Sequence, residues 1–340
     1  MPSTIQFPGG DVEAQLSFYN PPVDGSEPYF TLGRDASNKP KFNFSDKIVD
    51  VNIHDLRDSK KPFTLDHDAF EIVTGAPPAP KTIDFMDDEA IRRYYYPEVQ
   101  QLVSDKISGD SQVFIYDHTV RHEMGDGQHR PLTRVHIDHT ADNAARRVRQ
   151  YFPQEAERLL KNRYRIVNVW RPLNAQPLES YPLAFASAAS FDDADVIPVE
   201  HCYEDGSLVR EVGLVKYSPK QAWYYLSGMR NTERILLKCF DSDSLKEGSE
   251  VACKTPHSAF SDPRTRSDAE GRFSIEQPET SQHHERGTSV RPKFQYALMD
   301  IFGGAWGHFS TYEENLIIIE TNDKVNVKEE LLKKGAIIEG

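Results

Sequence analysis

The second half of the chain is a succession of short β-strand patterns separated by turn residues. From residue 183 onward, apolar runs of strand length alternate with Asp, Gly, Ser and Pro, as in DADVIPVEHCY, VREVGLVKYS, AWYYLSGM, ERILLKCFDS and EVACKTPHSAF. Strands this short bury their apolar faces only against a second sheet, as in a sandwich or a barrel. Helical patterns precede them over 86–108, where Pro97 is expected to break or kink the helix, and over 140–163, where Pro153 divides the pattern in two. The sequence therefore predicts a mainly β fold with flanking helices.

Composition narrows the class of partner. The chain has 340 residues and a formal net charge of −13, which argues against a nucleic-acid backbone or an anionic membrane surface as partner. No stretch approaches the roughly 20 apolar residues that span a bilayer. The N-terminal stretch lacks the basic and apolar regions of a signal peptide. The three cysteines are odd in number and suggest no disulfide framework, so we expect a cytoplasmic protein in a reducing compartment.

The stretch TRVHIDHT places a histidine and an aspartate two residues apart in a strand-like run, as His136 and Asp138. Residues i and i+2 of a strand project to the same face. Imidazole nitrogen and carboxylate oxygen suit Fe(II), and a second histidine from a distant strand completes a facial triad. The best candidate is His257 in CKTPHSAFSDP, which barrel closure can bring back to the first pair. The alternative for an isolated H-x-D pair is a solvated strand face, and His139 is expected at the surface or behind the ligands.

A second motif follows the distal histidine. In GRFSIE, Arg272 and Ser274 lie on one strand face. A guanidinium group pairs bidentately with a carboxylate, so these two residues are predicted to hold the distal carboxylate of 2-oxoglutarate. Arg264 and Arg266 lie nearer to His257 and compete for this role, and Arg272 is favoured because Ser274 accompanies it.

Several blocks of sequence resemble a fungal non-haem Fe(II)/2-oxoglutarate-dependent hydroxylase/desaturase family, related to gibberellin desaturase and to the small subunit of bacterial cephalosporin 7-alpha-methoxylase. They occur in family order over roughly residues 110–276, as RVHIDHT, RIVNVWRPL, YPLAFASAASFDDADVIPVE, VKYSPKQAWYYLSGMRNTERILLKCFDS, TPHSAFSDP and RFSIE. The resemblance implies a double-stranded β-helix, which is a jelly-roll, cupin-like barrel. It also implies Fe(II) and 2-oxoglutarate as cofactors, with ascorbate as a reductant.

Carried over residue by residue, the resemblance implies that the catalytic iron ligands are His136, Asp138 and His257, and that Arg272 and Ser274 bind the cosubstrate. Further residues are expected around the substrate or behind the ligands: Asn168, Trp170, Arg171, Tyr116 and Lys238. Three of these have a structural alternative. Arg171 is equally compatible with a buried salt bridge, Asn168 with a hydrogen bond to the backbone, and Lys238 with an ion pair to Asp241. Cys239 is expected to be a small core residue.

We expect one oxygenase domain over residues 1–340. N-terminal strands and a connector reach to about residue 85, the family-like catalytic core covers 110–276, and the segment 277–340 departs from the family pattern. The implied reaction oxidises an unactivated C–H bond of a small secondary metabolite or amino-acid-derived substrate and releases succinate and CO₂. Hydroxylation, desaturation and oxidative ring closure, such as aziridine formation, all stay open, as does a homodimer. Molecular oxygen is the second substrate, and the alternative function is a non-catalytic cupin-like metal-binding or small-molecule-binding module.

Overall fold

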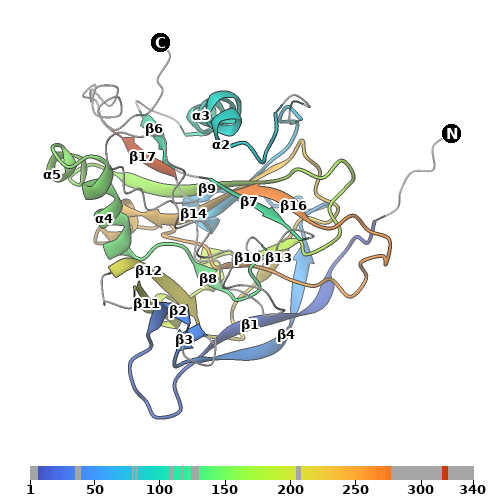
Figure 1. Ribbon diagram of the computed structural model, residues 1–340, viewed down its shortest axis with the longest axis horizontal. Coiled ribbons are helices and arrows are strands. Elements are labelled where there is room, and N and C mark those ends of the chain that lie inside the picture. Colours follow the sequence, from blue (N-terminus) through green and yellow to red (C-terminus); the bar gives the residue numbers. More distant parts are fainter. Residues whose placement is uncertain are drawn as a thin grey trace.

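Two β-sheets face each other and form the body of the molecule (Figure 1). The structure is a computed structural model, and it describes residues 7–34, 40–78, 80, 83–107, 111–116, 118–123, 130–203, 208–276 and 316–320. Within these residues one sheet has ten strands and the other has seven. This two-sheet arrangement with flanking helices confirms the predicted fold class, a double-stranded β-helix barrel.

The larger sheet is built from both halves of the chain. Its strands follow the order β1 (Val12–Asn20), β4 (Ser45–Asp55), β13 (Trp223–Tyr225), β10 (Leu183–Ala186), β15 (His257–Ala259), β8 (His136–Ile137), β12 (Leu208–Val215), β11 (Val196–Cys202), β2 (Phe30–Arg34) and β3 (Pro40–Phe42). The two short strands β15 and β8 lie side by side in the middle of this order. Residues far apart in sequence therefore meet at the centre of the sheet.

The smaller sheet has the order β5 (Phe70–Val73), β14 (Arg234–Asp241), β9 (Tyr164–Pro172), β16 (Phe273–Glu276) and β7 (Thr119–His122). Strand β17 (Leu316–Glu320) pairs with β9 and also with β6 (Ser111–Ile115). The β-branched run LIII of the C-terminal segment thus forms β17 and joins this sheet. The rest of the divergent segment 277–340 lies outside the described residues, so its place in the domain stays a prediction.

The helices described are α1 (Leu65–Asp68), α2 (Asp88–Ala90), the π-helical turn η1 (Ile91–Tyr95), α3 (Tyr96–Lys106), α4 (Ala141–Tyr151), α5 (Ala156–Leu159) and the 3₁₀ turns η2 (Ala188–Ser190), η3 (Asp193–Asp195) and η4 (Ser242–Leu245). Helices α2, α3, α4 and α5 lie on the outside of the barrel (Figure 1). The expected division at Pro153 is confirmed, because it lies between α4 and α5. The helical run changes form next to Pro97, as expected for a break or kink: the π-helical turn η1 ends at Tyr95, and α3 begins at Tyr96 with Pro97 in its first turn. Among the described helices, none has the length and apolarity needed to cross a membrane.

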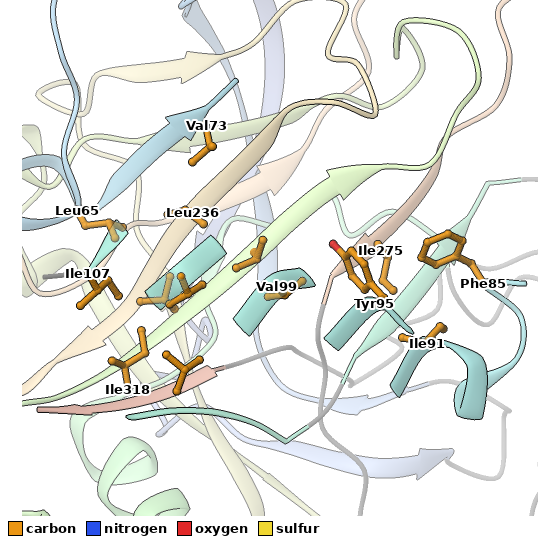
Figure 2. Close-up of a cluster of buried hydrophobic side chains, with 14 of the residues drawn as sticks. Leu65, Val73, Phe85, Ile91, Tyr95, Val99, Ile107, Leu236, Ile275 and Ile318 are labelled. Atoms are coloured by element: carbon orange, nitrogen blue, oxygen red, sulfur yellow. The ribbon is translucent and has the colours of Figure 1, made fainter. Parts of the chain in front are cut away.

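Strand β9 has two faces with different neighbours. Val167 and Val169 point outward and pack with Val99 and Val103 of α3, in the apolar cluster that Figure 2 shows. The alternate residue Trp170 points inward and packs with Phe185 of the larger sheet. The helix therefore fixes the outer face of β9, and the inner face is left to line the space between the two sheets.

Candidate metal centre

Two histidines and one aspartate converge between the sheets. His136 of β8 and His257 of β15 are cross-strand partners, and their ring centroids lie 4.6 Å apart. Asp138 follows directly after β8, and its Oδ1 lies 3.4 Å from the Nε2 atom of each histidine. One ligand atom from each residue lies within 4.8 Å of the other two. The structure thus brings together the three residues that the sequence singled out.

Local sequence explains why the chain turns at this point. Thr140 caps the N-terminus of α4 and accepts a hydrogen bond from the Asn143 backbone N–H, so the chain leaves the sheet directly after Asp138. On the other side of β8, Gly213 of β12 pairs with Ile137. A Cβ atom on Gly213 would lie 2.7 Å from Val196 Cγ1, so only glycine allows this close approach.

The backbone orients both imidazole rings. His136 Nδ1 lies 2.6 Å from the Arg134 carbonyl oxygen, and His257 Nδ1 lies 3.2 Å from the Thr255 carbonyl oxygen. A carbonyl oxygen only accepts hydrogen bonds, so each Nδ1 is the donor and each Nε2 points toward Asp138. Histidine ligands of metal ions are typically held by such outer contacts.

Asp138 is held through the oxygen that points away from the histidines. Its Oδ2 accepts hydrogen bonds from Asn168 Nδ2 and from the Cys239 thiol, whose Sγ lies 3.0 Å away. Oδ1 is left facing the two Nε2 atoms. Asn168 therefore donates to the Asp138 carboxylate, which differs from the backbone hydrogen bond given as its alternative, and the Cys239 side chain is a partner of Asp138 as well as a core residue.

Burial and the charges within the cluster shift its pKa values. Burial and the nearby His257 lower the pKa of His136 to about 4. Burial opposes ionisation of Asp138, but His257, His136 and the Cys239 thiol outweigh it and hold the pKa of the carboxyl well below its ordinary value. Burial also disfavours the charged form of His257, yet Asp138 outweighs it and raises the pKa of His257 to about 9. Without a metal, the cluster at neutral pH therefore holds one proton, between His257 and Asp138.

His139 is excluded from the cluster although it follows Asp138 directly. Its Nδ1 lies 2.8 Å from Asn143 Nδ2, and the side chain is buried rather than at the surface. Burial, followed by the charge of Arg147, lowers its pKa to about 3. His139 is therefore a neutral packing residue beneath the site.

A small cavity joins the cluster to the residues of the R-x-S motif. Arg272 lines it together with the three convergent side chains and is itself 1% exposed. Its Nε donates to Ser274 Oγ at 3.0 Å, one terminal nitrogen donates to the Tyr181 carbonyl at 3.1 Å, and the guanidinium lies 5.0 Å from the centre of the Trp170 ring. Trp170 and Ser274 thus fix the direction in which Arg272 faces the cavity.

Two charged residues of this cavity were missed in the sequence, namely Arg121 and Glu276. Arg121 of β7 is the cross-strand partner of Ser274, and its Nε donates to Glu276 Oε2 at 3.1 Å. Alternation along β16 carried a signal for Glu276, because it lies two residues after Ser274. Arg121 carried no such signal, since only strand pairing brings it to the cavity.

Three of the residues expected around the substrate or behind the ligands lie away from the cavity. Arg171 is on the outer face of β9, where it contacts the Asn231 carbonyl at 2.6 Å and Glu98 at 3.3 Å. Lys238 is fully buried, with Nζ 2.6 Å from Asp241 Oδ2. Both residues follow the ion-pair alternative. Tyr116 lies among the apolar residues behind α4, with its ring 4.8 Å from that of Tyr151, and does not line the cavity.

The competing arginines are used for other contacts. Arg264 pairs with Asp262 and also donates to the carbonyls of residues 9–11, which holds the N-terminal strand against the barrel. Arg266 pairs with Glu179 at 2.7 Å. Neither arginine lines the cavity, so only Arg272 of the three sequence candidates faces the convergent donors.

A larger open pocket of about 550 Å³ lies away from this centre, between α3, β6 and the α4–α5 region. Its described lining contains glutamine, serine and apolar side chains and no titratable group. The convergent donors, rather than the size of a pocket, therefore mark the chemical site.

Comparisons with known proteins agree with a metal site formed by two histidines and an aspartate. A family model described as an oxidoreductase/YMDC permease-like domain matches residues 16–277. The hydroxylase/desaturase poxK of Penicillium oxalicum is 31% identical over 294 residues, which cover 79% of this chain and 90% of poxK. The alpha-ketoglutarate-dependent dioxygenase phiK from a fungal species is 32% identical over 277 residues, which cover 78% of this chain and 94% of phiK. The chain belongs to this family of Fe(II)/2-oxoglutarate-dependent oxygenases.

A solved structure of the iron and alpha-ketoglutarate-dependent endoperoxidase NvfI supports the same assignment. It superimposes with a TM-score of 0.71 at 27% identity and covers 79% of this chain and 97% of NvfI. The predicted enzyme class and the cofactors Fe(II) and 2-oxoglutarate are thereby confirmed. The donor set fits the ion, since two neutral imidazoles and a carboxylate suit Fe(II). The relation to gibberellin desaturase and to the cephalosporin methoxylase stays a prediction.

Proposed function

We propose that this oxygenase binds one Fe(II) through His136 Nε2, His257 Nε2 and Asp138 Oδ1, and that Arg272 and Ser274 bind the distal carboxylate of 2-oxoglutarate. The observation that carries the proposal is the convergence of three lone-pair donors on one point, each fixed from behind by the protein. The one proton of the metal-free cluster is shared only by His257 and Asp138, whereas one cation contacts all three atoms at once.

The bound iron and cosubstrate supply the oxidising chemistry, in which O₂ and 2-oxoglutarate are converted to succinate and CO₂ as the substrate loses hydrogen or gains oxygen. The protein contributes position. Asn168 and Cys239 hold Asp138, the Arg134 and Thr255 carbonyls hold the rings, and Trp170 supports Arg272. Burial of the donors keeps bulk water away from the reactive centre.

The substrate we propose is a small secondary metabolite or an amino-acid-derived compound with an unactivated C–H bond. The relatives are named hydroxylases, desaturases and an endoperoxidase, and these names support the type of oxidation rather than a particular substrate. Hydroxylation places one oxygen atom of O₂ in the product and the other in succinate. Desaturation or ring closure instead removes two hydrogens from the substrate and releases water.

The test is succinate release from 2-oxoglutarate by the full chain with candidate substrates, with and without Fe(II) and O₂. We expect release that needs both, and that is lost in His136→Ala. His201→Gln is the matched control, since His201 is a buried histidine that stacks on Phe30 and does not line the cavity. Mass spectrometry of the substrate distinguishes oxygen gain from hydrogen loss. Succinate release that is independent of iron, or unchanged in His136→Ala, would contradict the proposal.

The alternative, a binding module without turnover, is not favoured. A binding module without turnover does not account for three oriented donors that share a cavity with a buried arginine held by Ser274. The binding module would be supported instead if the wild-type chain bound metal but consumed no 2-oxoglutarate with any of the substrates tested.

Three further proposals concern the setting of the enzyme. We propose a single oxygenase domain, a cytosolic location without nucleic-acid or membrane partners, and a homodimer as the form to test. The net charge of −13 and the odd number of cysteines support the location and the choice of partners. Sedimentation equilibrium measures the oligomeric state, and a single cooperative unfolding transition is the result expected for one domain.

A further inference from the structure

The cavity holds two buried arginines and one carboxylate besides the metal-binding donors. Arg121 and Arg272 are 2% and 1% exposed, and Glu276 lies between them. Arg121 lies in β7 and Glu276 in its paired strand β16, while Arg272 directly precedes β16, and all three line the cavity. The proposed function uses only Arg272, so the other two need an account of their own.

Glu276 contacts both arginines, and the contact to Arg121 is the shorter. Its Oε2 lies 3.1 Å from Arg121 Nε, whereas Oε1 lies 3.5 Å from a terminal nitrogen of Arg272. A carboxylate this close to Arg272 competes with a carboxylate of the cosubstrate for the same guanidinium group. Whatever holds Glu276 toward Arg121 therefore keeps Arg272 available.

The charges lead to the same conclusion. Two guanidinium groups and one carboxylate leave a single net positive charge, which matches one distal carboxylate of 2-oxoglutarate. Without Arg121, Glu276 would neutralise Arg272, and the pocket would offer no net charge to the incoming anion. In a buried site such uncompensated or cancelled charges strongly affect affinity.

We propose that Arg121 is a positioning residue of the cosubstrate pocket, which holds Glu276 away from Arg272 so that Arg272 binds the distal carboxylate of 2-oxoglutarate. This inference rests on the proposed function of Arg272. It predicts that Arg121 affects only the binding of the distal carboxylate, and not that of the 2-oxo acid end of the cosubstrate. A 2-oxo acid without a distal carboxylate, such as 2-oxopentanoate, should not respond to Arg121.

The experiment is calorimetric titration of 2-oxoglutarate and of 2-oxopentanoate into the Mn(II)-loaded full chain under nitrogen, which reads binding without turnover. Arg121→Gln should weaken 2-oxoglutarate binding by about tenfold or more, in line with the loss of a charged contact, and leave 2-oxopentanoate within about twofold. Arg121→Lys should retain most of the affinity because it keeps the charge. The decisive variant is Arg121→Gln combined with Glu276→Gln, which removes the competitor and should restore most of the affinity for 2-oxoglutarate.

Arg234→Gln is the matched control. Arg234 is an equally buried arginine paired with a carboxylate, Glu98, away from the cavity, so its loss should leave the ratio of the two affinities unchanged. No rescue by Glu276→Gln, or equal weakening of both 2-oxo acids, would overturn the role of Arg121. Failure of wild-type protein to bind 2-oxoglutarate at all would instead overturn the proposed function, so the two failures are distinct.

Discussion

Two buried polar clusters of this molecule differ in what their atoms can do for one another. In the cluster around Lys238, an ammonium and a guanidinium face carboxylates: Lys238 Nζ lies 2.6 Å and an Arg163 terminal nitrogen 2.7 Å from Asp241 Oδ2. In the cluster around Asp138, Oδ1 lies 3.4 Å from the Nε2 atom of each histidine, and at neutral pH one proton between His257 and Asp138 takes the place that a metal ion can fill. The first cluster is complete without a ligand, whereas the second is completed by a cation.

The two clusters even share a strand. Lys238 and Cys239 are neighbours on β14, and alternation sends the lysine to one side and the thiol to Asp138 on the other. Burial and charge alone therefore do not mark a site. The match of donors to acceptors does. Substitutions in the Asp138 cluster should therefore lower metal affinity and preserve stability, and substitutions in the Lys238 cluster should do the reverse.

The largest effect is expected from Asp138→Asn. The amide removes the negative charge of the proposed ligand set but preserves its volume, so metal binding and succinate release should fall below detection. The fold should survive, because the buried carboxylate and its desolvation are removed together. Metal titration and thermal unfolding of the same preparation measure the two properties. Retained iron-dependent turnover would show that the two clusters do not differ as described.

Lys238→Met should have the reverse signature. It leaves Asp241 buried with one cation fewer, and breaking a buried pair costs about 3–5 kcal/mol of unfolding free energy. Metal affinity of the folded protein should stay within about twofold, since Lys238 contacts none of the proposed ligands. Urea unfolding measures the first property and Mn(II) titration the second. A loss of metal affinity in the folded variant beyond this twofold range would show that the two clusters are coupled.

Cys239→Ala tests whether the neighbour of Lys238 on β14 belongs to the Asp138 cluster. The thiol supports Asp138 from behind, and removal of such an outer contact typically lowers metal affinity by about 10–100-fold. Cys239→Ser keeps a donor and should lose less affinity than the alanine variant. Mn(II) titration of both variants is the measurement, and equal affinities in the two would exclude a hydrogen-bonding role for the thiol.

The smallest single step concerns pH, at one pH unit a time. Burial lowers the pKa of His257, but the neighbouring Asp138 carboxylate outweighs burial and raises this pKa to about 9 in the metal-free protein. At neutral pH a metal ion must therefore displace one proton. Mn(II) affinity should therefore rise by about tenfold per pH unit from pH 7 toward 9 and level off above it. In His257→Ala the weaker residual affinity should lose most of this slope. An affinity that falls as the pH rises would contradict the assignment of the proton.

The sequence predicted the fold and the centre of the site because both depend on local patterns. Short strand runs, H-x-D spacing and the R-x-S motif are readable within a few residues, and His257 follows once the barrel is expected to close. Arg171 could not be assigned, because only the folded chain brings its partner Glu98 near. For Lys238 the partner Asp241 was visible in the sequence, but not which side of β14 faces the cavity.

The same limit explains the residues that were missed. Arg121 reaches the cavity through the pairing of β7 with β16, and a strand register between distant segments is not written in either segment. Cys239 was expected to be a core residue, and it is buried, but its contact with Asp138 depends on the distance between two sheets. Long-range pairing, rather than local propensity, determines both.

The most direct test of the central claim is an anomalous difference map from crystals of the full chain grown with Fe(II) and 2-oxoglutarate under nitrogen. We expect one iron peak per chain, with His136 Nε2, His257 Nε2 and Asp138 Oδ1 each at about 2.1 Å, a typical length for nitrogen and oxygen ligands of a divalent metal. The density of 2-oxoglutarate should run from that peak toward Arg272. A peak at any other side chains, or ordered 2-oxoglutarate away from Arg272, would contradict the account.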